Sequence, residues 1–391
     1  MKSELSHAGR VGRELKRSFG ENDEMIIVRS PGRINLIGEH TDYNEGFVLP
    51  SAIDRAIYLA LAPGRNHETR IKSLNFDEVI SFDVSRPVRM NRSWANYLVG
   101  IVDQIAKAGK QLSGFDCVFT GDIPIGAGMS SSAAIEAGLA FALNTLFDLK
   151  IDLVKLARLA QRAENEFVGV RCGIMDQFAN LMSKGDSAIQ LDCRSLEYRY
   201  IPFSRDNLKF VLCDTGVKHD LASSEYNVRR LQCESGVEKI RSHVPAVHSL
   251  RDVNIAMLEE FKSEMDETVY KRCSFVLEEN ARLQAACTFP QNGDFVRFGE
   301  QLYKSHEGLR DKYEVTCREL DILVEAASEI SGVLGARMMG GGFGGCTLNL
   351  VVESSVREFE SRISEEYLKD TGINLRMFEC NLVPGTSIVH D

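Results

Sequence analysis

Residues 29–44 read RSPGRINLIGEHTDYN and are the most informative stretch of the chain. The apolar run at 25–28 before them predicts a buried strand, and Pro31-Gly32 is expected to break it. A break at the end of a strand is a common place for a functional site. The stretch then places a cation, two carboxylates and an imidazole close together: Arg33, Glu39, Asp42 and His40.

These side chains suit a ligand that is rich in hydroxyl groups, because carboxylates accept hydrogen bonds from hydroxyls and arginine or histidine donates to them. The alternative is a solvated polar loop held by local salt bridges. The neighbouring Ile34, Leu36 and Ile37 imply partial burial, and buried charges need partners or a ligand. The stretch therefore favours a binding site.

The composition limits the possible classes of protein. A length of 391 residues suggests two domains, and a hydrophobic fraction of 44% is ordinary for a globular protein. The net charge of −10 disfavours nucleic acid as a partner, although local positive sites can still hold an anionic substrate. The ten cysteines form no C-x-x-C pair, so a zinc site is not expected.

The N-terminus carries no apolar segment of the secretory kind, and no run of the chain approaches the length of a membrane span. Free thiols together with the missing signal favour a reducing compartment. We therefore expect a cytoplasmic protein that has neither a membrane nor a nucleic acid as its partner.

Hydrophobic periodicity predicts a mixture of helices and strands. Helices are expected at 5–19, 95–108, 131–147, 152–168, 221–243, 265–286, 317–331 and 354–369. Strands are expected at 25–29, 47–49, 57–62, 115–120, 187–191, 208–213, 347–352 and 374–382. No internal repeat or long linker is visible, and the weakest join between the two halves lies near 195–207.

Residues 121–134 read GDIPIGAGMSSSAA and have the composition of an anion-binding loop. Glycines let the backbone approach phosphate oxygens, and the serines are expected to cap the following helix, whose free N–H groups attract anions. A serine hydroxyl can also bind Mg²⁺, which prefers oxygen ligands. The alternative is an ordinary glycine loop before a capped helix. A P-loop and a dinucleotide fingerprint are excluded, because G-x-x-x-x-G-K-[ST] is absent and Ser131 occupies the position of the third glycine.

A second glycine-rich loop occurs at 335–346, which read GARMMGGGFGGC and contain a nominal G-x-G-x-x-G. A dinucleotide site needs a strand before this pattern and a helix after it. Here the periodicity predicts a helix before the loop and the strand 347–352 after it. The loop at 335–346 is therefore not expected to be a dinucleotide-binding loop.

These segments resemble the motifs of the galactokinases, within the GHMP family of small-molecule kinases. Residues 32–50 are similar to the signature that opens these enzymes. Residues 124–134 resemble the second GHMP motif, with Met129 in place of the usual leucine. Residues 335–346 resemble the third motif, with Met339 where galactokinases often carry threonine.

Further segments resemble the family outside these three motifs. Residues 172–178 match the segment that carries the catalytic aspartate and a glycine that contacts the sugar, although Arg171 stands where a proline is often found. Residues 221–230 resemble the segment whose tyrosine contacts the sugar, and 93–97 resemble the one whose tryptophan lines the adenine pocket. Glu164 matches the position of the Mg²⁺ carboxylate.

The resemblance implies an α+β fold with the two lobes of a GHMP kinase. The N-terminal lobe, expected at 1–203, would be similar to ribosomal S5 domain 2. The C-terminal lobe, expected at 204–391, would be ferredoxin-like. The active site would lie in the cleft between the lobes, and we expect the protein to be a monomer.

The implied reaction is the ATP- and Mg²⁺-dependent phosphorylation of D-galactose at its anomeric hydroxyl. It yields α-D-galactose 1-phosphate and ADP and is the first committed step of galactose catabolism in the Leloir pathway. By the same resemblance, Asp176 accepts or orients the proton of that hydroxyl, and Arg33 stabilises the developing alkoxide and favours the carboxylate form of Asp176. Ser132 and Glu164 hold Mg²⁺, which bridges the phosphates.

The residues that the resemblance assigns to galactose are Arg33, Glu39, His40, Asp42, Gly173, Asp176 and Tyr226. Those that it assigns to ATP are Trp94, Pro124, Gly126, Ala127, Gly128, Met129, Ser130, Ser131 and Ser132. For the tryptophan, a core anchor beside a helix is the alternative.

Two other functions remain possible. One is a kinase for another sugar, such as arabinose, galacturonate or N-acetylgalactosamine. The other is a regulator that binds a sugar and ATP without catalysis. The intact serine loop and the intact Asp176 favour an enzyme over the regulator.

Overall fold

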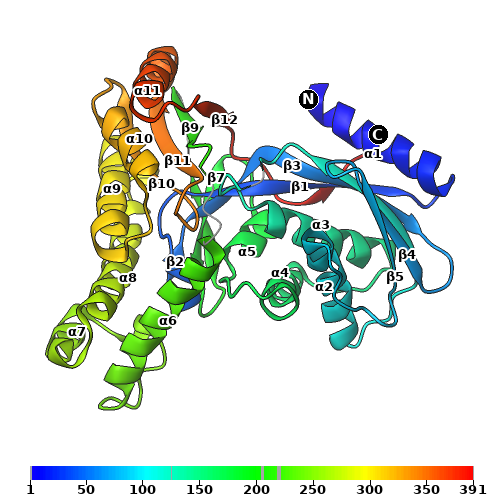
Figure 1. The fold of residues 1–391 in the computed structure, drawn as a ribbon, viewed down its shortest axis with the longest axis horizontal. Coiled ribbons are helices and arrows are strands. Elements are labelled where there is room, and N and C mark those ends of the chain that lie inside the picture. Colours follow the sequence, from blue (N-terminus) through cyan, green and yellow to red (C-terminus); the bar gives the residue numbers. More distant parts are fainter. Residues whose placement is uncertain (1, 125, 204–206, 218–221, 391) are drawn as a thin grey trace.

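The computed structural model describes residues 2–124, 126–203, 207–217 and 222–390. These residues form helices and three β-sheets, so the expected α+β class is confirmed (Figure 1). All ten cysteines lie in this part of the chain and are free thiols. Of the helices formed by these residues, none is both long enough and apolar enough to cross a membrane.

The largest sheet takes its strands from both ends of the chain. Its order is β13-β1-β3-β6-β4-β5, and all neighbouring strands are antiparallel except β4 and β6. The strands are β1 (Ile26–Asn35), β3 (Pro50–Pro63), β4 (Glu68–Ser73), β5 (Glu78–Asp83), β6 (Phe115–Gly121) and β13 (Ser387–Ile388).

Helices cover both faces of this sheet (Figure 1). Helix α1 (Lys2–Phe19) packs against β3 and β6 on one face. On the other face, α3 and α5 pack against β1 and β3, and α2 and α4 pack against α3. The bounds of these helices are α2 (Ser93–Lys107), α3 (Ser131–Leu146), α4 (Leu153–Arg162) and α5 (Met175–Met182).

Strand β1 differs from the prediction at Pro31-Gly32. The strand does not break there but continues to Asn35, with a shift of register against β3 between Pro31 and Arg33. Proline lacks a ladder donor, so within a strand it fits best at such an irregularity. Gly32 allows a close approach, because a Cβ atom there would lie 2.8 Å from the carbonyl oxygen of Met129. The predicted break was wrong, but an irregularity is present directly before Arg33.

Two smaller sheets complete the fold. The three-stranded sheet has the order β2-β7-β8, and the four-stranded sheet has the order β10-β11-β9-β12. Their strands are β2 (Phe47–Val48), β7 (Ser187–Asp192), β8 (Tyr198–Pro202), β9 (Leu208–Asp214), β10 (Val333–Met338), β11 (Cys346–Val352) and β12 (Arg376–Cys380). The four-stranded sheet packs against α9, α10 and α11.

The remaining helices lie on the side of the molecule that carries the four-stranded sheet (Figure 1). Their bounds are α6 (Ala222–Arg241), α7 (Ile255–Glu260), α8 (Glu267–Ala286), α9 (Phe295–Gly308), α10 (Arg318–Ser328) and α11 (Val356–Thr371). Helix α6 packs against α8, and α8 packs against α9.

Most predicted elements are present with small shifts at their ends. The periodicity does not reveal β4, β5 and β8, which are short and carry charged or exposed side chains. The helix expected at 152–168 changes at Ala163 from an α-helix to a π-helix, Ala163–Val168. Such π-helical turns often occur at functional sites.

The prediction of a helix directly before the second glycine-rich loop was wrong. Helix α10 ends at Ser328, and strand β10 leads into the loop. Strands β10 and β11 therefore form a hairpin around the glycines. A dinucleotide fingerprint is still excluded, because the loop is followed by β11 and not by a helix.

Candidate active site

The first motif and later segments of the chain meet around one pocket, which we call the polar pocket. Its volume is about 210 Å³. Its lining includes all the residues that the sequence assigns to the sugar: Arg33, Glu39, His40, Asp42, Gly173, Asp176 and Tyr226. Glu164 and the loop glycines Gly340 and Gly341 also line it. Folding therefore brings together residues that are as far apart in the chain as Arg33 and Gly341.

Asp176, at the start of α5, is held from two sides. Arg33 donates through Nε to Oδ1 at 2.7 Å and through Nη2 to Oδ2 at 2.8 Å. Ser130 donates its hydroxyl to Oδ2. Oδ2 thus accepts two hydrogen bonds, whereas Oδ1 accepts one and keeps a lone pair for a ligand. The orientation of this carboxylate is fixed by the protein itself.

Ser130 is not the helix cap that the sequence predicts. It stands at the N-cap position of α3, but its side chain makes no capping bond, and its φ of 60° lies in the left-handed region. Its hydroxyl instead reaches Asp176. The prediction of capping serines was wrong for this residue, because a partner distant in the sequence replaces the local N–H groups.

His40 presents a free ring nitrogen to the polar pocket. Its φ of 61° is left-handed, and its Nδ1 lies 2.8 Å from the hydroxyl of Tyr43. Nε2 is buried and has no hydrogen-bond partner among the described residues. Burial lowers the pKa of His40 to about 4, so the imidazole is neutral near neutral pH. A neutral, unpartnered nitrogen of this kind is suited to a ligand hydroxyl.

Asp42 lies opposite Gly173, and the two positions depend on each other. A Cβ atom on Gly173 would lie only 2.0 Å from Oδ2 of Asp42, so a side chain there would displace the carboxylate. Burial raises the pKa of Asp42 to about 7, and the charge of Asp176 acts in the same direction. Burial also raises the pKa of Tyr226, which keeps its phenol protonated as a donor.

Glu39 is fixed by a residue that sequence reasoning missed. Arg337, on β10, has no exposed surface and donates through Nη2 to Oε1 of Glu39 at 2.9 Å. The backbone N–H of Gly340 donates to the same oxygen at 2.8 Å. Arg337 also donates through Nε to the carbonyl of Leu36 at 2.9 Å and binds the carbonyl of Asn35. The third motif therefore holds the first motif in place.

Glu164 lies in the π-helical turn, beside other buried polar groups. Gln177 donates to its Oε2 at 2.7 Å. Burial raises the pKa of Glu164, the charge of Asp176 adds to this effect, and the nearby side chain of Ser132 partly opposes it. Glu136 on α3 is buried next to it, and burial and Glu164 together raise the pKa of Glu136 well above its usual range.

A second pocket, which we call the apolar pocket, lies beside the N-terminus of α3 and has a volume of about 300 Å³. Trp94, Phe76 and Phe119 contribute to its walls, and Ser131 and Ser132 line it as well. The indole N–H of Trp94 donates to Oε2 of Glu78 at 2.8 Å, and its ring stacks on Phe76 with centroids 5.9 Å apart. Trp94 is therefore a pocket wall as well as a packing residue.

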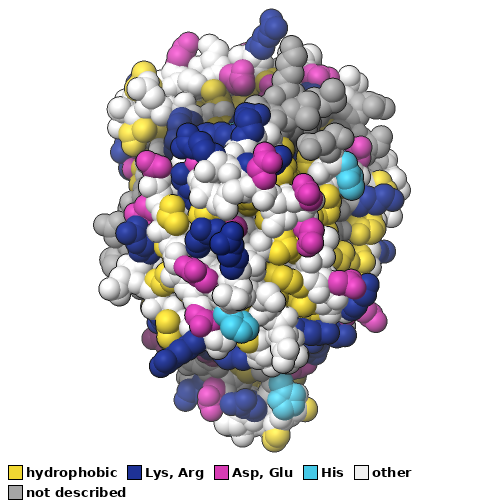
Figure 2. Space-filling model, turned by 90° about the vertical axis from the view of Figure 1, so that its right-hand side faces the viewer, with side chains coloured by type: hydrophobic (Ala, Val, Ile, Leu, Met, Phe, Trp, Pro, Cys, Tyr) yellow, Lys and Arg dark blue, Asp and Glu magenta, His cyan; other side chains and the backbone are white. Residues whose placement is uncertain are grey.

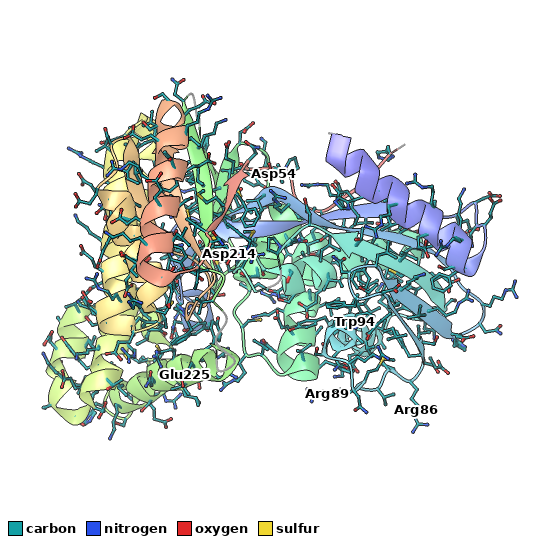
Figure 3. The ribbon with its side chains drawn as sticks, turned by 45° about the horizontal axis from the view of Figure 1, so that its top comes forward. Asp54, Arg86, Arg89, Trp94, Asp214 and Glu225 are labelled. Carbon is teal, nitrogen blue, oxygen red and sulfur yellow. The ribbon has the colours of Figure 1, made fainter. Side chains whose placement is uncertain are left out.

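Trp94 and the start of α6 belong to different sides of the molecule. Figure 3 shows Trp94 near α2, on the same side as Arg86 and Arg89, and shows Glu225 on α6, on the other side. The apolar pocket takes all its lining from residues 57–135, whereas the polar pocket combines both sides.

Of the residues assigned to ATP, Trp94, Ser131 and Ser132 line the apolar pocket, whereas the other described ones do not. These others form the loop between β6 and α3, in which Ala127 and Met129 are buried. This loop is tied to Arg33, whose backbone N–H donates to the carbonyl of Met129 at 3.2 Å and whose Nη1 donates to that of Gly128 at 2.5 Å.

The two pockets meet at Ser132 and Glu164. Ser132 lines the apolar pocket, Glu164 lines the polar pocket, and the side chain of Ser132 is near enough to the carboxyl of Glu164 to oppose the rise in its pKa. A ligand that extends from the apolar pocket past the N-terminus of α3 therefore ends beside Asp176. Helix N-termini favour anionic groups. The arrangement suits transfer of a group from a bound anion to a hydroxyl in the polar pocket.

Signals for some of the missed residues are visible in the sequence. Glu136 is the one charged residue in the segment 131–146, with apolar residues on both sides of it, and an isolated charge of this kind needs a partner. Arg337 stands just before the glycine loop, but its partners in the first motif are more than 290 positions away, so no local pattern reveals its role. Arg171 pairs with Glu234 at 2.9 Å, and this departure from the family leaves Gly173 and Asp176 in the polar pocket.

Comparisons with known proteins agree with this geometry. Three family models match the chain: "Galactokinase galactose-binding signature" at residues 13–63, "GHMP kinases N terminal domain" at 96–184 and "GHMP kinases C terminal" at 283–369. The galactokinase of Roseiflexus sp. (strain RS-1) is 40% identical over 383 residues, which cover 98% of this chain and 97% of that protein. That of Clostridium acetobutylicum is 41% identical over 382 residues, with coverages of 96% and 98%.

A solved structure is similar over the same length. The Lactococcus lactis galactokinase complexed with galactose has a TM-score of 0.91 and an identity of 34%, and the match covers 96% of this chain and 98% of that one.

Proposed function

The chain belongs to the galactokinases of the GHMP kinase family, and from this premise we propose that it transfers the γ-phosphoryl group of ATP to the anomeric hydroxyl of D-galactose. The products are α-D-galactose 1-phosphate and ADP. The observation that carries the proposal is the position of Asp176: its carboxylate, clamped by Arg33 and Ser130, lies in the polar pocket beside the junction with the apolar pocket.

Galactose occupies the polar pocket. The carboxylates of the buried Glu39 and the half-buried Asp42 accept hydrogen bonds from sugar hydroxyls, and the phenol of Tyr226 donates one. The free Nε2 of His40 bonds one more hydroxyl. A sugar that lacks a matching hydroxyl leaves one of these buried groups unpaired, which is the physical source of selectivity.

Asp176 orients the C1 hydroxyl and takes its proton as the oxygen attacks the γ-phosphorus and ADP leaves. Oδ1 is the acceptor, because Oδ2 already accepts from Arg33 and Ser130. Arg33 stabilises the negative charge that develops on the attacking oxygen. Its Nη1 is also bonded to the carbonyl of Gly128, which fixes the guanidinium relative to the phosphate loop.

ATP binds with its adenine in the apolar pocket and its phosphates along the loop to the N-terminus of α3. The indole of Trp94 and the ring of Phe119 offer flat apolar surface to the base. The backbone of Gly126, Gly128 and Ser131 and the dipole of α3 favour the phosphates.

Mg²⁺ fits the residues at the junction of the pockets. Ser132 and Glu164 supply a hydroxyl and a carboxylate, the oxygen donors that this hard ion prefers. The described residues hold no group of three or more His, Cys, Asp or Glu that could act as a metal cage. Mg²⁺ is usually bound through one or two carboxylates together with substrate phosphates, and Glu164 supplies one such carboxylate. When bound, the ion neutralises charge on the phosphates.

We also propose that the chain divides into lobes at 203/204, acts as a monomer and works in the cytoplasm. The division is supported by the sheets, since β8 ends at Pro202 and β9, the next strand, belongs to a different sheet. The last strand, β13, returns to β1, so the C-terminal end of the chain secures the first lobe.

An assay of ADP release over a panel of sugars tests the function. We expect turnover with galactose to exceed that with arabinose, galacturonate and N-acetylgalactosamine. A preference for one of these three would assign the kinase to another sugar. Saturable binding of galactose and ATP without any ADP release would instead indicate a non-catalytic regulator.

A further inference from the structure

A third pocket lies away from the two described above and is lined mainly by cations. Its volume is about 360 Å³, and we call it the basic pocket. The cationic side chains that line it are Lys110, Lys150, Lys155, Arg158 and Arg162. None of the described residues in its lining is acidic. The whole chain has 46 Lys and Arg against 56 Asp and Glu, so its composition does not account for this cluster.

The cluster arises from one face of helix α4. Lys155, Arg158 and Arg162 are three and four positions apart, so their side chains share a face of the helix. This face meets Lys110, which follows the end of α2, and Lys150, which precedes α4. Three separate segments therefore converge on one concave surface.

The positive charge of the basic pocket is only partly compensated. Lys150 pairs with Asp148 at 2.6 Å and Lys155 with Asp152 at 2.9 Å, but all four side chains are more than half exposed, and such pairs are weak. Arg158, Arg162 and Lys110 form no ion pair with a carboxylate of the described residues. Figure 2 shows one face of the molecule, on which Lys and Arg side chains lie among Asp and Glu side chains.

The shape and chemistry of the pocket select the ligand class. Its volume falls in the range of small-molecule sites, about 300–1,000 Å³. Arginine and lysine recognise phosphoryl oxygens, arginine through two parallel hydrogen bonds. Ile151 and Leu159 add an apolar floor for an organic group. Extended polyanions and anionic membranes contact broad surfaces, so the net charge of −10 repels them. A small anion held inside the pocket is repelled less.

We propose that the basic pocket binds a small molecule with two or more phosphoryl groups and that its occupancy changes the activity of the kinase site. More than one phosphoryl group is needed because one such group, with a charge of about −2, leaves most of the cations unbalanced. The binding stands apart from the proposed function, whereas the effect on activity depends on it.

The link to the kinase site follows from the chain itself. Arg162 directly precedes the π-helical turn, and Glu164 lies two positions further. Helix α2 also connects the basic pocket with the apolar pocket. Trp94, in its first turn, lines the apolar pocket, and Lys110, just after its end, lines the basic pocket. Gln104 of α2 donates to Glu166 of the π-helical turn at 2.9 Å, which joins the two helices. An anion that draws Arg162 toward it therefore acts on the turn that carries Glu164.

Isothermal titration of the full chain with inorganic pyrophosphate, without Mg²⁺, tests the binding. We expect the charge-reversed double variant K110E/R158E to bind pyrophosphate at least about tenfold more weakly than the wild type, because each lost charge-assisted hydrogen bond is worth about that factor. The matched control K304E/K369E makes the same change in net charge on α9 and α11, outside the pocket, and is expected to keep most of the affinity.

Equal pyrophosphate affinity in both double variants would overturn the proposal, because the anion would then bind elsewhere, for example at the phosphate loop. Binding of a DNA duplex or of phosphatidylserine vesicles that depends on Lys110 and Arg158, without pyrophosphate binding, would also overturn it in favour of a macromolecular partner.

The effect on activity is measured separately. Without pyrophosphate, K110E/R158E is expected to phosphorylate galactose at the wild-type rate. With pyrophosphate, the wild type and K304E/K369E should change rate at fixed ATP by more than K110E/R158E does. An identical response in all three would overturn the link to the kinase site. If galactose is not the substrate, the titration still decides the binding.

Discussion

The polar pocket and the apolar pocket lie side by side but are built in different ways. The polar pocket is lined by buried charged groups from both sides of the molecule, and its carboxylates are fixed by long-range contacts such as Arg337–Glu39 and Arg33–Asp176. The apolar pocket is formed by residues 57–135 alone and consists mainly of apolar and aromatic surface.

From this difference we expect substrate specificity to depend mainly on the polar pocket. A buried polar group that loses its partner costs far more than an apolar wall that loses some area. Substitutions in the polar pocket should therefore have large and specific effects, whereas those in the apolar pocket should have smaller effects. The following substitutions test this contrast, from the largest expected effect to the smallest.

Asp176→Asn should reduce kcat by ~10²–10⁴, the usual contribution of a general base. The amide keeps the size of the side chain but cannot take the proton. Galactose binding, followed by titration calorimetry, should remain measurable. Asp23→Asn, at an exposed position, serves as the control. Near-normal turnover of a folded Asp176→Asn protein would remove Asp176 from the mechanism.

Arg337→Met should raise the KM for galactose by roughly 10- to 100-fold and leave the KM for ATP much less changed. Oε1 of Glu39 then loses one of its two donors, and a hydrogen bond to a charged group is worth about 1.5–3 kcal/mol. Kinetics with each substrate varied in turn measure this split.

Loss of stability alone would not raise the KM for galactose more than the KM for ATP. Arg272→Met removes another buried arginine, which pairs with Glu314 and lies outside the lining of the polar pocket. Thermal unfolding of both variants separates the two effects. Equal changes in both KM values for Arg337→Met would mean that Arg337 only stabilises the fold.

Glu164→Ala should raise the Mg²⁺ concentration at half-maximal activity roughly tenfold, and Ser132→Ala should raise it by less, since a carboxylate is the stronger ligand. Activity is titrated against free Mg²⁺ at saturating ATP. Ser131→Ala, at the adjacent position of the same helix, is the control. Unchanged midpoints in both test variants would contradict the assignment of the metal.

The kcat/KM for galactose should rise by at most about tenfold between pH 6 and pH 8. With a pKa of about 7, the ionised fraction of Asp42 increases from about 0.1 to about 0.9 over this range, and the carboxylate is the stronger acceptor for sugar hydroxyls. Asp42→Asn should flatten the profile, whereas His40, with a pKa of about 4, contributes no step there.

The ionisation of Asp42 has the opposite effect on the stability of the fold. Because the pKa of Asp42 in the folded chain lies above the usual value of 3.8, its protonation stabilises the fold fully below that value, and this contribution is lost as the pH rises through about 7. A kcat/KM that does not rise in the wild type, or that rises equally in Asp42→Asn, would show that the ionisation of Asp42 does not control galactose use.

Trp94→Ala should weaken ATP binding by about 2- to 10-fold, because aromatic contacts contribute about 0.5–1.5 kcal/mol beyond the buried area. Galactose binding should change less. Trp94 is the sole tryptophan, so its fluorescence in the wild type should respond saturably to ADP. Tyr198→Ala, on β8, is the control. An unchanged ATP affinity and an unresponsive fluorescence would place the adenine elsewhere.

The part of the fold that could be predicted from the sequence is the part with strong local patterns. The long helices α3, α6, α8 and α11 follow from their periodicity and lie close to the expected ranges. Strands β4 and β5 were missed because they are short and their buried positions alternate with charged or exposed ones. β4 lies between β6 and β5, and β5 is at the edge of the sheet. Their order in the sheet is decided by contacts that are far apart in the chain.

The candidate site shows the same division. Part of the lining of the polar pocket was predicted because motifs place Arg33, Glu39 and Asp42 within one short segment. The role of Arg337 could not be read from any local pattern, because its partners in the first motif are brought close only by folding. For Glu136 the isolated charge is visible in the sequence, but its partners Glu164 and Gln177 are not. Ser130 was assigned to the helix cap because local N–H groups were the only partners that the sequence made visible.

The sequence by itself determined the family, the α+β class and the residue types of the site, because these depend on short motifs and on local periodicity. Only the tertiary structure decided that β1 passes through Pro31, that Ser130 holds Asp176, and that Arg337 fixes Glu39. The physical reason is that the energy of a buried polar group depends on its partner and its distance from water. Both are set by the packing of the whole chain and not by neighbours in the sequence.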